Sequence, residues 1–214
     1  CCVSFQTPTA PPLPCRRLEF IGDSMTCGFG NLSAGPQEPF SPTTEDSTQT
    51  YAALTSRHFG ADTRYLCRSG RGIISDCEGS RAQPVPRWFF ETSLTHPQPW
   101  DFSSWQPDVA VINLGTNDRN GGVSQEEFTA GAVAFLRRIR GVYPNARLLW
   151  MYGLMDEDFI PAVKGAVETV RAEDPLVDLL LVPSIYPHPE EQGACNHPNL
   201  AAHARAARAL ITKI

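Results

Sequence analysis

The sequence predicts an α/β protein: a three-layer α/β/α sandwich with a central, mostly parallel sheet of five strands. Short apolar runs typical of strands alternate along the chain with longer segments of helical periodicity. Several of these runs are apolar almost throughout, as expected of strands that helices cover on both faces. A chain of 214 residues is long enough for one domain with a sizeable core.

The predicted domain spans residues 16–214, and the Pro- and Thr-rich residues 1–15 are expected to form a lead-in or linker. The strand-like runs are RLEFIG at 17–22, TRYLC at 63–67, PDVAVINLG at 107–115, ARLLWMYG at 146–153 and VDLLLV at 177–182. Helical patterns occupy 48–60, 124–142, 159–173 and the Ala-rich segment after His197 and Pro198.

Two helix starts carry recognisable signals. Ser124 and Glu127 form a capping-box pattern, so a helix is expected to begin there. The apolar residues that share one face of this helix are Phe128, Phe135, Leu136 and Ile139. Pro198 is expected in the first turn of the last helix, where its missing N–H costs nothing.

Composition argues against several classes of partner. The net charge is −5, and the 18 basic residues form no long cluster, which disfavours nucleic acid and anionic membranes. No apolar run approaches the roughly 20 residues that span a bilayer. The first ten residues lack the order of a signal peptide, so we expect that any export signal has already been removed.

The seven cysteines include no closely spaced pair of the zinc or thioredoxin kind. Cys67 and Cys77 flank a short loop, and their spacing leaves a disulfide and free thiols equally open. A zinc site at Cys195, His197 and His203 has no evident fourth ligand, so no metal is expected. No cofactor is expected either, because the chain carries no nucleotide-binding glycine motif.

Three groups directly follow predicted parallel strands and should therefore meet at one edge of the sheet. They are Ser24, Asn117 and the SGRG loop that contains Gly72. A serine nucleophile needs donors for the oxyanion, and the Asn117 amide, the Gly72 N–H and the Ser24 N–H could supply them.

A serine nucleophile also needs a general base that takes its proton. Histidine is the residue expected in this role, and the chain has only five histidines. His197 is the best placed, because its NHPN context puts it in a loop directly before a helix. His188 is the second choice. The remaining three, which are expected to be structural or solvated, are His58, His96 and His203.

Four segments, FIGDSMTCG, RSGRG, NLGTND and NHPN, resemble in that order the blocks of the SGNH hydrolases, also called the GDSL esterase family. The resemblance runs from about residue 17 to the end of the chain and implies a flavodoxin-like fold. It implies that Ser24 is the nucleophile, that His197 is the general base, and that Gly72 and Asn117 complete the oxyanion hole with the Ser24 amide. Asp23 then mainly shapes the turn.

Three stretches, FIGDSMTCGFGN, YLCRSGRGI and VAVINLGTND, look especially like carbohydrate esterase family 2, whose members remove acetyl groups from plant polysaccharides. Such members usually carry a β-sandwich domain before the catalytic one, and the fifteen or so residues before the predicted domain are too few for it. Because members of this family deacetylate polysaccharides, the resemblance implies an acetylated oligo- or polysaccharide as substrate. The four tryptophans are candidate sugar platforms, although Trp150, in an apolar run, is more typical of a core.

One departure concerns the acid of the triad. The superfamily places an Asp three or two residues before the catalytic His, where this chain has Ala194 and Cys195. We expect a Ser-His dyad in which a backbone carbonyl, that of Cys195, orients the imidazole, and reduced tolerance of low pH. The alternative is a carboxylate from elsewhere, and the candidates are Asp156, Glu190 and Glu191.

The sequence thus predicts a secreted, cofactor-free serine esterase that hydrolyses small acyl esters, acetyl first, of carbohydrates. If the protein is an enzyme of another kind, the alternative function is that of a lipase or thioesterase of the same superfamily. The alternative to an efficient enzyme is a catalytically weak relative that binds carbohydrate, because fold alone does not determine function.

Overall fold

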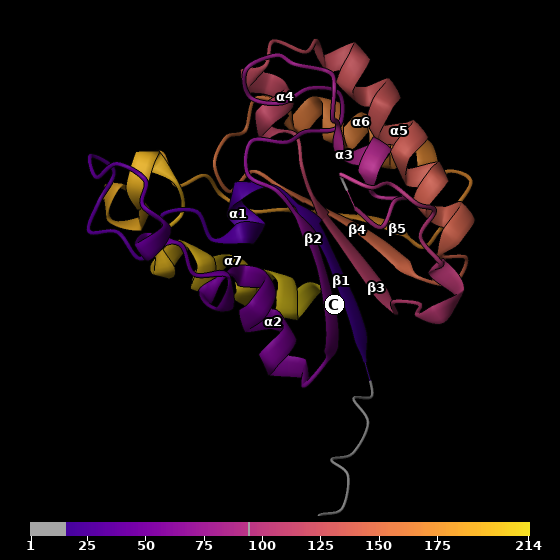
Figure 1. Cartoon of the computed structure of the whole chain (residues 1–214), viewed down its shortest axis with the longest axis horizontal. Coiled ribbons are helices and arrows are strands. Elements are labelled where there is room, and N and C mark those ends of the chain that lie inside the picture. The colour runs from indigo at the N-terminus through magenta and orange to yellow at the C-terminus, as the bar shows by residue number, and fades with distance from the viewer. Residues whose placement is uncertain (1–15, 94) are drawn as a thin grey trace, which may run out of the picture.

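The predicted strands form one sheet in the computed structural model, which describes residues 16–93 and 95–214. They are β1 (Arg17–Gly22), β2 (Asp62–Cys67), β3 (Val109–Asn113), β4 (Arg147–Tyr152) and β5 (Val177–Leu181). The order across the sheet is β2-β1-β3-β4-β5, and every neighbouring pair is parallel (Figure 1). The predicted sheet is confirmed, and the lead-in predicted at 1–15 lies outside the described residues.

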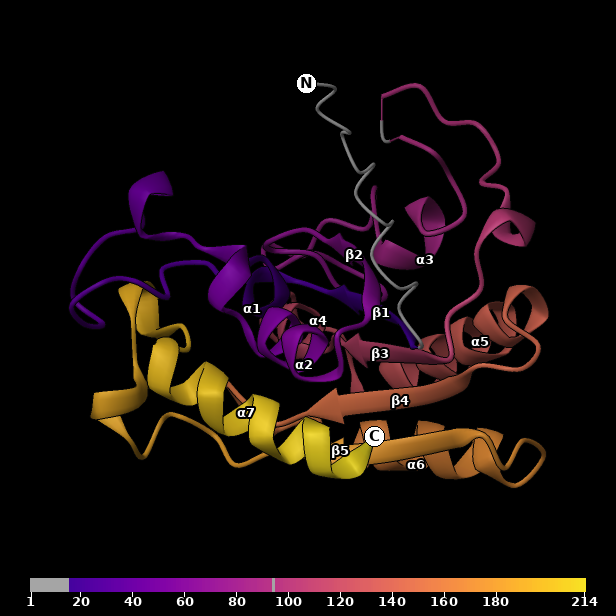
Figure 2. The same ribbon diagram turned by 90° about the horizontal axis from the view of Figure 1, so that it is seen from below.

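Helices cover both faces of the sheet, which confirms the three-layer sandwich (Figures 1 and 2). Helices α2 (Tyr51–Phe59) and α7 (Leu200–Lys213) pack together on one face, and α5 (Gln125–Val142) and α6 (Ile160–Arg171) on the other. The shorter helices are α1 (Ser24–Cys27), α3 (Val85–Trp88) and α4 (Thr116–Asn120). Single 3-10 turns lie at Pro42–Thr44, Ser47–Gln49, Phe102–Ser104, Pro189–Glu191 and Ala194–Asn196.

Each face of the sheet has its own apolar core. On the side of α2 and α7, β-strand residues such as Phe20 and Val111 pack on the small side chains of Ala202 and Ala206. On the side of α5 and α6, the core includes Ile112, Trp150, Phe128, Phe135 and Val163. Alternate residues of the central strands therefore enter different cores, so these strands are apolar on both faces.

The helix-start signals were only partly correct. The Ser124 hydroxyl accepts a hydrogen bond from the Glu127 N–H (3.2 Å), and the four predicted apolar residues of α5 are buried. The prediction for Pro198 was wrong, because α7 begins at Leu200. The Asn199 side chain caps this helix by accepting from the Ala201 and Ala202 N–H groups, and Pro198 lies before that cap.

No helix in residues 16–93 and 95–214 combines the length and apolar character needed to cross a membrane.

Candidate active site

The site begins where β1 ends. The Asp23 carboxylate caps α1 by accepting from the Met25 N–H (3.1 Å), and this places Ser24 in the first turn of the helix. Burial raises the pKa of Asp23 to about 8, although the Met25 N–H acts in the opposite direction. Asp23 thus has the turn-forming contact expected of it, in a buried environment that disfavours its charged form.

Two loops from opposite ends of the chain bring Ser24 and His197 together. The Ala194 N–H donates to the carbonyl of Gly30 (3.1 Å), and a Cβ on Gly30, whose φ is 62°, would lie 2.5 Å from that of Ala194. The Phe29 ring packs on the His197 ring at a centroid distance of 4.3 Å. In this arrangement the Nε2 atom of His197 lies 3.0 Å from the Oγ atom of Ser24.

The second imidazole nitrogen meets a backbone carbonyl. The Nδ1 atom of His197 lies 3.2 Å from the carbonyl oxygen of Cys195. A proton on Nδ1 donates to this carbonyl and leaves Nε2 free to accept from the Ser24 hydroxyl. Cys195 and Asn196 both adopt left-handed backbone conformations, with φ of 52° and 58°, which non-glycine residues rarely adopt. Such strain is typical of functional sites.

The three candidate carboxylates have other partners. Glu191 pairs with Arg205, Glu190 lies beside His188, and Asp156 accepts from the Tyr152 hydroxyl. Within the described part of the chain, none is within hydrogen-bond distance of the His197 ring.

Burial lowers the pKa of His197, although hydrogen bonds to the backbone of Cys195 and Ala194 raise it. A base with a lowered pKa stays neutral, and hence active, to lower pH than an ordinary histidine. The reduced tolerance of low pH expected for a dyad therefore does not follow, and the physical expectation has the opposite sign.

Asn117 lies in α4, directly after β3, and its side chain ties together the segments that meet at this edge. Its Nδ2 atom donates to the carbonyl of Arg71 (2.9 Å) and to the Asp23 carboxylate (3.1 Å). Both amide hydrogens are therefore engaged, and Asn117 lines the same cleft as Ser24.

The loop after β2 is held by Asp118. This carboxylate accepts from the backbone N–H groups of Ile73 (2.8 Å), Ile74 (2.6 Å) and Ser75 (3.1 Å). Burial raises the pKa of Asp118 to about 6 despite these three donors. Gly72 is buried against the same carboxylate, and a Cβ there would lie 2.5 Å from the Ser75 carbonyl oxygen.

Gly70, and not Gly72, lines the cleft at the candidate nucleophile. The cleft has a volume of about 420 Å³, and its lining includes Ser24, Asn117, His197 and Gly70. In the described structure the Gly70 N–H has no hydrogen-bond acceptor. The sequence prediction named Gly72 of the RSGRG loop, whereas the glycine of that loop that lines the cleft is Gly70.

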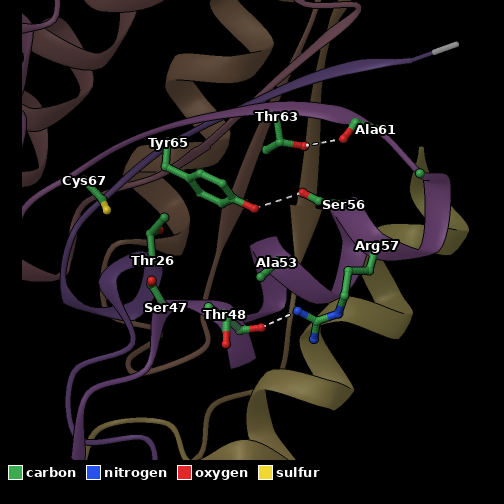
Figure 3. A pocket seen from close by; sticks show the side chains of 11 residues that line it. Thr26, Ser47, Thr48, Ala53, Ser56, Arg57, Ala61, Thr63, Tyr65 and Cys67 are labelled. Atoms are coloured by element: carbon green, nitrogen blue, oxygen red, sulfur yellow. Dashed lines mark hydrogen bonds between the residues drawn. The ribbon is translucent and has the colours of Figure 1, made fainter. Parts of the chain in front are cut away.

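A larger cavity, of about 720 Å³, lies between α2 and β2 (Figure 3). Two of its polar side chains have partners in the lining: the Tyr65 hydroxyl donates to the Ser56 hydroxyl (3.2 Å), and Arg57 donates to the backbone carbonyl of Thr48 (2.5 Å). The described residues that line it include no histidine and no carboxylate. The larger cavity is therefore not the candidate active site, which is the cleft where Ser24 and His197 are in contact.

The structure also shows the surroundings of the two cysteines considered for a disulfide and of His203. Cys67 and Cys77 are both free thiols, so the disulfide considered for them is absent. Cys67 instead lies against Cys27, and the hydrogen bond between the two thiols lowers the pKa of Cys27. His203 is fully buried, and its Nδ1 atom accepts from the Tyr51 N–H (3.2 Å).

The sequence matches the GDSL-like Lipase/Acylhydrolase family over residues 20–209. It is 35% identical over 151 residues to Cellulase/esterase CelE from Acetivibrio thermocellus, and 30% identical over 160 residues to an Acetylxylan esterase / glucomannan deacetylase from Cellvibrio japonicus. These alignments cover 68% and 67% of this chain but only 18% and 44% of the two relatives.

The fold is similar to that of a family two carbohydrate esterase from Clostridium thermocellum in complex with cellohexaose. The TM-score is 0.90 at 29% sequence identity, and the match covers 97% of this chain and 66% of that one. A family 2 carbohydrate esterase from Corynascus thermopiles gives a TM-score of 0.81 at 28% identity, covering 97% of this chain and 67% of that one. The resemblance expected from the four sequence segments is confirmed, and the chain belongs to the GDSL-like Lipase/Acylhydrolase family.

Proposed function

We propose that this chain is a serine esterase that removes small acyl groups, acetyl first, from carbohydrate hydroxyls, and that it acts outside the cell. The observation that carries the proposal is the 3.0 Å contact between Ser24 Oγ and His197 Nε2 in an open cleft. The substrate class is supported by its relatives, which include an acetylxylan esterase / glucomannan deacetylase and a family two carbohydrate esterase.

In the proposed reaction, His197 Nε2 takes the Ser24 proton while Oγ attacks the ester carbonyl carbon. The tetrahedral intermediate collapses when the imidazolium returns this proton to the departing sugar oxygen, and the acyl group stays on Ser24. A water molecule then loses a proton to Nε2 and attacks the acyl-enzyme. Collapse of this second intermediate releases the carboxylic acid and restores the Ser24 hydroxyl.

The oxyanion hole is assigned to the Ser24 N–H, the Gly70 N–H and the Asn117 amide. Gly70 replaces Gly72 because it, unlike Gly72, is among the described residues that line the cleft with Ser24. Asn117 contributes the amide hydrogen that it donates to Asp23, which the oxyanion would share with that carboxylate. This hydrogen bond is the longer of the two that the amide makes. The shorter bond to the Arg71 carbonyl keeps the amide in place during this change.

The role of the missing acid falls to the Cys195 carbonyl, which fixes the imidazole tautomer. It stabilises the imidazolium less than a carboxylate would, because it carries no full charge. We therefore expect an active dyad, and replacement of Asp156, Glu190 or Glu191 by its amide should leave turnover largely intact. Abolished turnover in one of these variants would show that a carboxylate completes a triad.

The direct test is hydrolysis of aryl esters of increasing acyl length and of acetylated xylan and glucomannan, by the wild type and by Ser24→Ala. Phenylmethylsulfonyl fluoride should inactivate the wild type and label Ser24, as located by mass spectrometry. Ser103→Ala, an exposed serine before β3, is the control and should keep wild-type rates. Absence of turnover in the wild type would favour a binding relative, and a preference for long acyl chains would favour a lipase.

A further inference from the structure

A second pocket, of about 280 Å³, lies beside edge strand β2, outside the catalytic cleft. Its volume is near the lower end of the roughly 300–1,000 Å³ typical of small-molecule sites. Its walls combine charged and aromatic side chains, including Glu19, Arg64, Phe89, Trp100 and Phe102.

Glu19 is the most unusual member of this lining. It is only 6% exposed and lies opposite Arg64 in the register of β1 and β2. Its Oε2 atom has no hydrogen-bond partner among the described residues. Burial raises the pKa of this carboxyl to about 7, although a hydrogen bond from Tyr143 and the charge of Arg64 lower it. A buried acceptor without a partner is costly, so a donor from a ligand in the pocket would be stabilising there.

The aromatic side of the pocket is open to solvent. Trp100 is 40% exposed, unlike the other three tryptophans, which are at most 8% exposed. The Arg64 guanidinium carbon lies 5.6 Å from the centroid of the Trp100 ring and 4.5 Å from that of Trp105. The pocket thus offers an acceptor, a fork of donors and an exposed aromatic face.

This combination selects against charged ligands. Arg64 already supplies the cation that the aromatic rings and Glu19 would otherwise attract, and Glu19 disfavours an anion. A neutral ring with several hydroxyl groups fits best, because it both donates and accepts and has apolar C–H faces for an indole. A sugar ring has this chemistry.

The pocket continues along β2 toward the catalytic cleft. A neighbouring pocket of about 270 Å³ shares Tyr65 and Leu66 with it and extends to Cys67. Two residues farther on, Ser69 lines the catalytic cleft. We propose that the pocket at Glu19, Arg64 and Trp100 is an accessory sugar site that holds a distant ring of the polysaccharide whose ester enters the cleft.

The accessory site rests on the proposed esterase function for its ligand class, and its test is separable from that function. Xylohexaose and mannohexaose, both without acetyl groups, are titrated calorimetrically into the wild type, Ser24→Ala, Trp100→Ala and Glu19→Gln. We expect at least one hexaose to bind the wild type and Ser24→Ala alike. Trp100→Ala should weaken its binding about tenfold, as is usual when a contact tryptophan is truncated, and Glu19→Gln should weaken it less.

Leu176→Ala, an apolar side chain 43% exposed just before β5 at the far edge of the sheet, is the matched control and should bind like the wild type. The indole N–H resonance of Trp100 should shift on addition of the hexaose. Rates on an aryl acetate should be the same in Trp100→Ala and the wild type, while KM for acetylated polysaccharide rises. Wild-type hexaose affinity in Trp100→Ala, or no binding to the wild type, would overturn the site even if Ser24 is confirmed as the nucleophile.

Discussion

Replacement of Glu19 by Gln tests how strongly the fold disfavours a buried carboxylate. The pKa of Glu19 rises from its ordinary value of 4.5 to about 7, chiefly through burial. Because the native state holds the proton more tightly than the unfolded chain, stability falls as pH rises between these two values and is level above them. At about 1.4 kcal/mol per pKa unit, the ionised carboxyl costs about 3 kcal/mol above pH 7. Gln has no such cost.

The measurement is urea unfolding of the wild type and Glu19→Gln at about pH 4.5 and about pH 8.5. The stability of the variant relative to the wild type should be higher at the alkaline pH by about 3 kcal/mol. Other titrating groups, Asp23 included, are present in both proteins and cancel in this comparison. An equal effect of Glu19→Gln at both pH values would refute the reasoning.

Three further outcomes follow from the site. Asn117→Ala should lower kcat on an aryl acetate by about 10²- to 10³-fold, while exposed Asn145→Ala does not, and equal rates would remove Asn117 from the oxyanion hole. Since burial lowers the pKa of His197, kcat/KM should rise with pH through a pKa below the ordinary value of about 6.5, and a midpoint above 7 would contradict this. Gly72→Ala should reduce both kcat and Tm, because its Cβ displaces the loop that Asp118 holds, and wild-type values of both would show that the loop adapts.

Much of the site could be predicted because parallel strands deliver their carboxyl ends to one edge. Ser24 follows β1 and Asn117 follows β3, so the sheet order alone places them together. His197 could be selected because it lies in a loop directly before a helix. Apolar patterning locates each strand and its carboxyl end along the chain, and this is enough to place the residues that follow at one edge of a parallel sheet.

The features that the sequence could not predict are contacts between segments distant in sequence. The choice between Gly70 and Gly72 depends on Asp118, which lies more than 40 residues away and fixes the loop by accepting from its backbone. Cys67 was compared with nearby Cys77, whereas the fold places it against Cys27. Spacing within one loop contains no information about such contacts.

The contact between Ser24 and His197 joins groups 173 residues apart in the sequence. During synthesis, the proposed nucleophile Ser24 leaves the ribosome early, and the proposed base His197 follows only when the final segment of the domain is made. We therefore expect esterase activity to appear late, after most of the sheet has formed. A nascent or truncated chain that lacks His197 should not hydrolyse esters. Recovery of activity would then report completion of the whole domain, a stricter criterion of refolding than secondary structure.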